Sequence, residues 1–439
     1  MLGAAALAIV VAATPPSAGG QEASAASPSF DGAAPASPDR GTGSSVATAP
    51  GPTVDEGQPP SETARWARAC SQHHPLCVHA APATADAITL AALDAADRAW
   101  DALTGVLGLP PPDAPVAGPW PVYLVDGVEG AGTARLAGRD PLARFDRGSS
   151  FALVDRGTSP GCPLDLALAR AVARGSLWRA APATDPGSAR AESEMLARLA
   201  VACAPDDDDA AAFQSEPERT VVDPTSPAFD RGASMLFEWL DATYGTQPGA
   251  LVLGLWALAP TRTPAAAWRW SGRPTGFDVL RASLAGALWT GSTFDDVLAA
   301  FSAARATATP PARPAWHVPW PDHPRRFLSP VPPAPTGASY VLVDMAGRPA
   351  GAALHAEAQW EDYGRMRWTA VKLAHGRAAA VLPVTSPDLA THASMTVDLL
   401  DGIDAVMIVG TNVGSTEHPF DPDQGVWEPH GWLLTIEGE

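Results

Sequence analysis

A predicted helix over residues 163–178 contains Arg170-Ala171-Val172-Ala173-Arg174, and Glu192 and Glu194 follow 18 and 20 residues after Arg174. The two carboxylates are side chains that bind metals or transfer protons. Guanidinium groups, in contrast, have no lone pair free for a metal at accessible pH. The zinc motif H-E-x-x-H, a phosphate-binding loop and a dinucleotide fingerprint are absent from the sequence. The sequence motifs alone therefore assign no catalytic residue.

Four cysteines form two groups along the chain. Cys70 and Cys77 occur with three histidines within ten residues, which are ligand types for zinc or copper. In an exported chain a disulfide is the stronger interpretation. Three pairings are possible; we favour Cys70–Cys77 and Cys162–Cys203, because Cys162 begins and Cys203 ends a predicted antiparallel helix pair.

The sequence Gly157-Thr158-Ser159-Pro160-Gly161 matches the G-x-S-x-G pattern of a nucleophile elbow. In such an elbow the residue after the serine donates its backbone N–H to the oxyanion hole. Pro160 has no N–H, so we interpret this segment as a loop.

Other acidic and aromatic residues are weaker candidates for binding. Asp421 and Asp423 precede a glycine as in calcium loops, but the distant bidentate glutamate is not matched, so an acidic turn is the main interpretation. The run 206–209 is predicted to be a solvated acidic loop. The chain has 15 tryptophans; exposed ones could stack on sugars, although core packing is the general expectation. We predict no cofactor, with calcium as the alternative.

Composition and the first residues indicate export. The 439-residue chain has a net charge of −19, which makes nucleic-acid binding a poor interpretation. Residues 1–19 start with an apolar run of signal-peptide length, and residues 20–62 are predicted to be a disordered linker. We expect a protein that is secreted, periplasmic or in the cell envelope, and not transmembrane once the signal is removed.

Two domains are expected after the linker, and the predicted fold class is α+β. Residues 63–305 have helical periodicity with short buried strands at 121–126 and 150–155. Residues 306–335 form a proline-rich linker. Residues 336–439 are predicted to be an antiparallel, jelly-roll-like β-sandwich, because seven short strand patterns are separated by turn residues.

The order of elements in the first domain resembles an exported zincin-type metallopeptidase of the gluzincin kind. That resemblance places helix 163–178 as the active-site helix, with arginines where both histidines would be and Ala171 where the general base would be. It leaves Glu192 or Glu194 as a candidate third zinc ligand, but the two histidine ligands are missing. The resemblance therefore implies a degenerate domain that has lost its zinc site. It also implies a candidate cleft at Arg170, Arg174, Glu192 and Glu194.

We predict an exported, non-catalytic, pseudo-peptidase-like protein that binds a ligand or serves at the cell surface. The first alternative is a secreted hydrolase with a dispersed carboxylate site. The second is a carbohydrate-binding protein that uses the sandwich. The partner is not indicated by the sequence; a polysaccharide or a cell-surface protein is the class we consider.

Overall fold

The computed structural model describes residues 57–439 with gaps, which are 62–65, 82–83, 129, 140–146, 183, 204–206, 223–224, 259–275, 286–291, 362–363, 385–389 and 415–428. The predicted signal peptide and all but residues 57–61 of the predicted disordered linker lie outside the described residues. In the part that is described, no helix combines the length and the apolar character that crossing a membrane requires.

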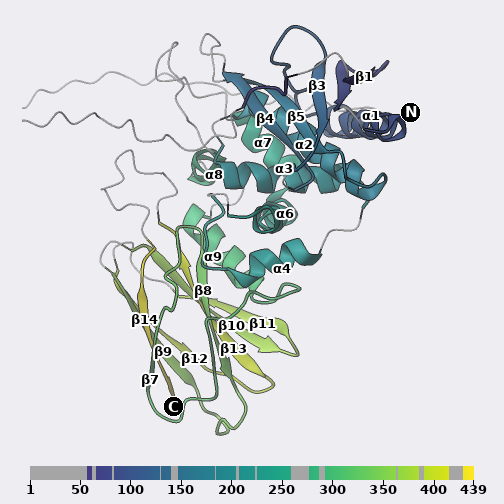
Figure 1. The fold of residues 1–439 in the computed structure, drawn as a ribbon. Helices are drawn as coiled ribbons and strands as arrows, with labels where there is room; N and C mark the ends of the chain where they lie inside the picture. Colours follow the sequence, from purple (N-terminus) through teal and green to yellow (C-terminus); the bar gives the residue numbers. More distant parts are fainter. Residues whose placement is uncertain are drawn as a thin grey trace, which may run out of the picture. The chain divides into compact units, whose positions relative to one another are not determined.

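A five-stranded sheet of order β1-β2-β3-β5-β4 begins the fold (Figure 1). Its strands are β1 (Ala67–Cys70), β2 (Leu76–Ala80), β3 (Trp120–Val125), β4 (Gly132–Arg139) and β5 (Gly148–Asp155). Strands β2, β3 and β5 are parallel, whereas β1 and β4 pair antiparallel at the two edges. Strands β3 and β5 are the two predicted strands, and their buried apolar runs are typical of parallel strands covered on both faces.

Helices cover and extend this sheet. They are α1 (Asp86–Trp100, continued as a π-helix over Asp101–Val106), α2 (Cys162–Ala180), α3 (Pro186–Ala200), α4 (Asp207–Ser215), α5 (Pro227–Gly232), α6 (Ser234–Tyr244), α7 (Ala250–Leu258), α8 (Gly276–Ala285) and α9 (Phe294–Arg305). Helix α2 packs on β4, β5 and α3, and most of its residues are buried. A proline in the first turn starts both α2 and α3, where its missing N–H costs nothing.

Both predicted disulfides are present. Cys70 and Cys77 face each other in the β1–β2 hairpin, with a Cα–Cα distance of 4.0 Å. Cys162 at the start of α2 joins Cys203, just beyond α3, at a Cα–Cα distance of 5.7 Å. The second bridge follows from the antiparallel hairpin of α2 and α3, as expected. Thr293 and Asp296 form a capping box at the start of α9.

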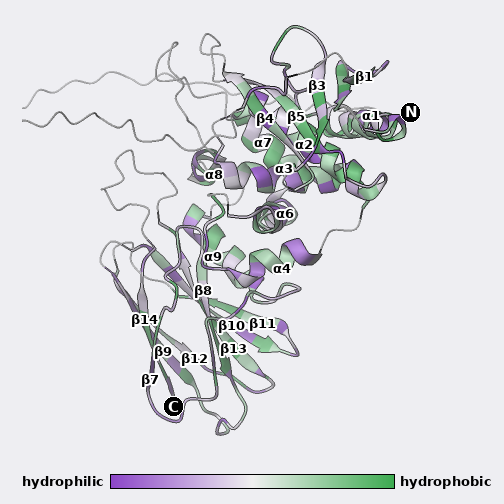
Figure 2. Ribbon diagram, viewed as in Figure 1, coloured by the Kyte–Doolittle hydropathy of each residue, from purple (hydrophilic) through white to green (hydrophobic). Residues whose placement is uncertain are grey.

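The described part of the predicted acidic loop, residues 207–209, is helical, and Asp208 is exposed whereas Asp209 is buried. Helix α4 begins at Asp207, and its first turn is strongly hydrophilic (Figure 2). Asp209 in this turn is only 1% exposed, because the guanidinium of Arg231 binds its carboxylate. The local charge pattern gave no sign of this partner, which lies 22 residues further along the chain.

The C-terminal part consists of two sheets, of order β11-β10-β13-β8-β6 and β12-β9-β14-β7. The strands are β6 (Trp316–Val318), β7 (Arg325–Leu328), β8 (Ala338–Asp344), β9 (Leu354–Trp360), β10 (Met366–Ala374), β11 (Arg377–Pro383), β12 (His392–Val397), β13 (Ala405–Asn412) and β14 (Trp432–Gly438). Side chains from both sheets share one apolar core. All seven strands predicted after residue 336 are present.

Two details differ from the expectation for this part. Strands β6 and β7 come from the segment predicted as a linker, and β6 pairs in parallel with β8, so the pairing is not wholly antiparallel. One face of the β11-β10-β13-β8-β6 sheet lies on the shared core, and its other face packs on helix α9. There the Tyr340 hydroxyl donates a hydrogen bond to the Ser302 carbonyl at 2.9 Å. The fold class is α+β, as predicted.

Candidate functional site

A cavity of about 360 Å³ lies beside the first sheet. Its walls come from the loop after β3, the start of β4, one residue of β5, and helices α2, α3 and α5. Among the described residues, its charged lining consists of five arginines and three carboxylates, which are Arg135, Arg170, Arg174, Arg190, Arg231, Asp126, Glu194 and Asp230. The cavity is therefore polar and rich in guanidinium groups.

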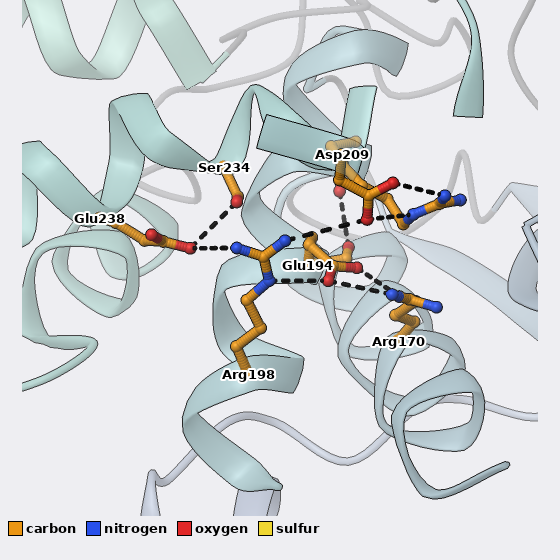
Figure 3. Close-up of polar contacts among 9 residues, drawn as sticks. Arg170, Glu194, Arg198, Asp209, Ser234 and Glu238 are labelled. Carbon is orange, nitrogen blue, oxygen red and sulfur yellow. Dashed lines mark hydrogen bonds and ion pairs between the residues drawn. The ribbon is translucent and has the colours of Figure 1, made fainter. Parts of the chain in front are cut away.

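Glu194 is the best-connected carboxylate of this lining (Figure 3). Its side chain is 1% exposed and accepts hydrogen bonds from Nε and Nη2 of Arg170 on helix α2, the second at 3.0 Å. Nε of Arg198, one turn further along α3, donates to the same carboxylate at 2.9 Å. Two guanidinium groups thus neutralise a buried charge that would otherwise be costly.

The network continues to helices α4 and α6 (Figure 3). Arg198 Nη1 lies 3.2 Å from Glu238 Oε1, which also accepts a hydrogen bond from Ser234 Oγ at 3.0 Å. Asp209 receives two parallel hydrogen bonds from Arg231, at 2.8 and 2.7 Å. This bidentate geometry is the strongest form of a guanidinium–carboxylate pair. Arg198 Nη2 also lies 3.9 Å from Asp209 Oδ2, so charged contacts join the five helices α2 to α6.

The other two carboxylates of the cavity also bind arginine. Asp230 on α5 accepts a hydrogen bond from Arg190 Nη1 at 2.6 Å and another from the Thr225 backbone N–H at 2.9 Å. Burial raises the pKa of Asp230, while these two donors act against that rise. Asp126, after β3, pairs with Arg156 at a more exposed position.

Arg174 and Arg135 are the two remaining arginines of the cavity lining, and they differ in burial. Arg174 is only 2% exposed, and its guanidinium lies over the ring of Trp178, 5.1 Å from the ring centroid. Arg135 is exposed on the edge strand β4, and it makes no ion pair with another residue of the described part of the chain. A guanidinium at this position can therefore reach a ligand without breaking a described ion pair.

Two glycines allow the loop and the edge strand to approach the helices. A Cβ atom on Gly132 would lie 2.3 Å from the Ala167 carbonyl oxygen of α2, so only glycine fits. Gly130 has a positive φ of 72°, and a Cβ atom there would lie 3.0 Å from Arg231 Nη1. These positions set the width of the cavity.

Glu192 faces away from the cavity, into the interior. Its Oε2 accepts a hydrogen bond of 2.7 Å from Trp256 Nε1 on α7, whereas its Oε1 has no hydrogen-bond partner among the described residues. Burial raises the pKa of Glu192 from 4.5 to about 8; the Trp256 hydrogen bond and the charge of Arg174 lower it, and the charge of Asp185 raises it further. This carboxyl group is therefore protonated in the folded protein at pH 7.

The structure places three of the four residues of the predicted cleft, Arg170, Arg174 and Glu194, in the cavity lining. Glu192 lies outside the lining but within electrostatic reach of Arg174. The calcium candidates Asp421 and Asp423 lie outside the described residues. Within the residues that are described, no three His, Cys, Asp or Glu side chains converge as a metal site would require. The G-x-S-x-G segment is the turn between β5 and α2, as interpreted.

Sequence reasoning does not single out Asp209, Asp230 and Arg231, the charged residues of α4 and α5. Asp209 belongs to the run that we predict to be solvated. The available signal is the adjacent pair Asp230-Arg231 beside apolar residues at helical spacing. A charged side chain that is buried there requires a partner of opposite charge.

The tryptophans of the predicted sandwich strands fill its core. Trp360, Trp368 and Trp432 are 7%, 2% and 2% exposed, and the centroids of neighbouring rings lie 6.4 and 5.8 Å apart. These three rings are not available to stack on a sugar. Trp316 on β6 is 38% exposed, and Trp427 lies outside the described residues.

Comparison with known proteins leaves the family of the chain open. No family model matches the chain, and no curated protein matches it. Among solved structures, a crystal structure of the pre-peptidase C-terminal domain of a collagenase from Bacillus anthracis is similar at 6% sequence identity and a TM-score of 0.19. That match covers 29% of this chain and 97% of the other, and a TM-score this low carries no argument.

Proposed function

We propose that this chain is an exported, non-catalytic binding protein whose first part has a zincin-like layout without the zinc site. The observation that carries the proposal is the ion pair between Arg170 and Glu194 in the cavity. In zincin-type peptidases of the gluzincin kind, a histidine on the active-site helix and a glutamate on a later helix bind the same metal ion. Here the corresponding helix positions carry a guanidinium and a carboxylate that neutralise each other.

The two disulfides support export. Disulfides form and persist in oxidising compartments, and all four cysteines of this chain are bridged. We propose a location outside the cytoplasm on this ground together with the apolar leader predicted for residues 1–19.

The layout can be tested by restoring the missing motif. The variant R170H/A171E/R174H places two histidines and a glutamate at the spacing of a zinc-binding helix, with Glu194 adjacent to position 170. We expect this variant to retain zinc in equilibrium dialysis, whereas the wild-type chain and the single variant R170H do not. A folded triple variant without zinc would contradict the zincin-like layout. Stoichiometric zinc on the wild-type chain would contradict the loss of the metal site.

A second candidate function is a hydrolase with a dispersed carboxylate site, and Asp230 favours it. This residue lines the cavity and has a raised pKa, as acid–base catalysts often do. If Asp230 were a catalyst, D230N would abolish a hydrolysis that the wild-type chain performs. We favour the binding function, because an arginine pairs with each of the three cavity carboxylates.

A further inference from the structure

Strands β6 and β7 form an exposed edge of the sandwich, within the segment that the sequence predicts to be a linker. Each is the last strand of its sheet: among the described residues, β6 pairs only with β8 and β7 only with β14. Trp316 on β6 joins the two strands, because its indole N–H donates a hydrogen bond of 2.9 Å to the Leu328 carbonyl on β7. The free edges of both sheets therefore meet at Trp316.

Large apolar side chains are exposed along this edge. Trp316 is 38% exposed, Leu328 66% and Val331 51%. The indole ring also contacts the ring of Phe327, with the two centroids 5.6 Å apart. This contact and the hydrogen bond to β7 fix the orientation of the indole. Trp316 is therefore a flat apolar platform that is ordered before a ligand binds, and the C–H face of a sugar ring fits such a platform.

The charge of this segment is opposite to that of the whole chain. Residues 313–331 contain three arginines and one acidic residue, whereas the complete chain has a net charge of −19. The acidic residue, Asp322, lies 3.6 Å from Arg325. Arg313 and Arg326 are exposed and make no ion pair within the part of the chain that the structure describes. Two guanidinium groups are thus open to an anionic ligand.

The two arginines lie at short distances along the chain from the apolar platform. Arg326 and Leu328 are exposed on the same face of β7, about 7 Å apart along the strand. Arg326 lies opposite Thr435 of β14, so its direct neighbour in the ladder carries no charge. Arg313 precedes Trp316 by three residues, a span of at most about 11 Å. These separations are comparable with the spacing of neighbouring units in a sugar chain.

We propose that this edge of the sandwich binds an acidic polysaccharide, one whose sugar units carry carboxylate groups. One sugar ring stacks on Trp316, and carboxylates of the same chain accept hydrogen bonds from Arg326 and Arg313. A guanidinium binds a carboxylate through parallel hydrogen bonds, which adds affinity that a neutral sugar lacks. Charges elsewhere on the protein are largely screened beyond about 8 Å at physiological ionic strength, so the local arginines determine the sign of the field at this edge.

This site is separate from the cavity of the first part, and the proposal goes beyond the function proposed above. The platform and the two arginines come from the sandwich edge alone. The presence or absence of a metal site between α2 and α3 therefore has no bearing on it.

Oligosaccharides of galacturonate are the probe, titrated calorimetrically into the full-length oxidised chain at pH 7 and physiological ionic strength. Neutral glucose oligosaccharides of the same length and polyglutamate are the ligand controls. We expect saturable binding of the galacturonate oligosaccharide and at least tenfold weaker binding of both controls. Equal binding of the neutral oligosaccharide would contradict the role of the arginines. Equal binding of polyglutamate would show that the ligand is an acidic peptide and would overturn the proposal.

Variants locate the binding on the sandwich edge. W316A removes the platform and R326Q removes one guanidinium, and each should weaken binding about tenfold. R377Q makes the same change as R326Q at an exposed position of β11, the opposite edge strand of the sheet that contains β6, and should leave binding unchanged. R326E reverses a charge on the surface, and it provides a second test if W316A fails to fold.

Absence of saturable galacturonate binding to the folded wild-type chain would overturn the proposal, as would equal weakening by R326Q and R377Q. Unchanged binding by a folded W316A variant would also contradict it. These outcomes are distinct from failure of the proposed loss of the zinc site, which is tested by zinc retention in the wild-type chain and in R170H/A171E/R174H.

Discussion

Replacement of Glu192 with glutamine should remove a large part of the pH dependence of stability. The pKa of Glu192 is about 8 in the folded protein and 4.5 without burial, so between these values the folded state holds a proton that the unfolded state releases. The free energy of unfolding therefore falls as pH rises through this window. A shift of about 3.5 pH units corresponds to roughly 5 kcal/mol, lost by pH 8 relative to pH 4.5.

The E192Q variant keeps a carbonyl oxygen that can accept the Trp256 hydrogen bond, but it cannot ionise. We expect urea unfolding at pH 5 to show equal or slightly lower stability than the wild type, by about 1 kcal/mol, because the amide places a donor without a partner at Oε1. At pH 8 the variant should be the more stable protein. The control E357Q changes an exposed side chain of strand β9, and its pH profile of stability should match that of the wild type.

Parallel pH profiles of the wild type and E192Q would refute this reasoning. They would show that Glu192 ionises normally in the folded protein, so that its environment is not the apolar interior formed around Trp256. The same measurement bears on the cavity, because an ionised Glu192 would add a negative charge near Arg174.

Three further substitutions test how the site is held. R170A leaves the buried carboxylate of Glu194 with fewer partners and should lower the free energy of unfolding by roughly 1 to 3 kcal/mol in urea unfolding, whereas R170K should recover part of the loss. G132A forces a Cβ atom onto a backbone oxygen of α2 and should cost about 1 to 3 kcal/mol by the same measurement; an unchanged stability would show that β4 is not so close to the helix. Loss of the Cys162–Cys203 bridge in the double serine variant should cost roughly 2 to 4 kcal/mol, and thermal unfolding that matches the wild type would contradict its structural role.

Periodic patterns in the sequence predict helices α2 and α3 and strands β3 and β5 of the cavity walls, within a few residues. Helices α2 and α3 carry apolar residues at helical spacing and begin with proline, so their position, and from it the Cys162–Cys203 bridge, could be inferred. Strand β4 was missed. Its alternation of Thr133 and Arg135 with buried Ala134 and Leu136 is a strand signal, but it is short and bounded by glycines.

The charged site was only partly predictable, because its partners are distant in sequence. Arg170 and Glu194 came from spacing on two predicted helices. The opposite environments of Glu192 and Glu194 depend on which face of α3 meets α7, which a single sequence does not specify. The sequence around Asp209 indicates a solvated acidic run, because its partner Arg231 lies 22 residues away in the sequence.

We propose that a guanidinium–carboxylate network occupies the position where a zincin-type peptidase would hold its metal and its general base. The most direct measurement is incubation of the full-length oxidised chain with a diverse peptide library in the presence of zinc, followed by mass spectrometry of the products. We predict no cleavage beyond that of the chelator-treated sample. Cleavage that a chelator abolishes and added zinc restores would contradict the claim.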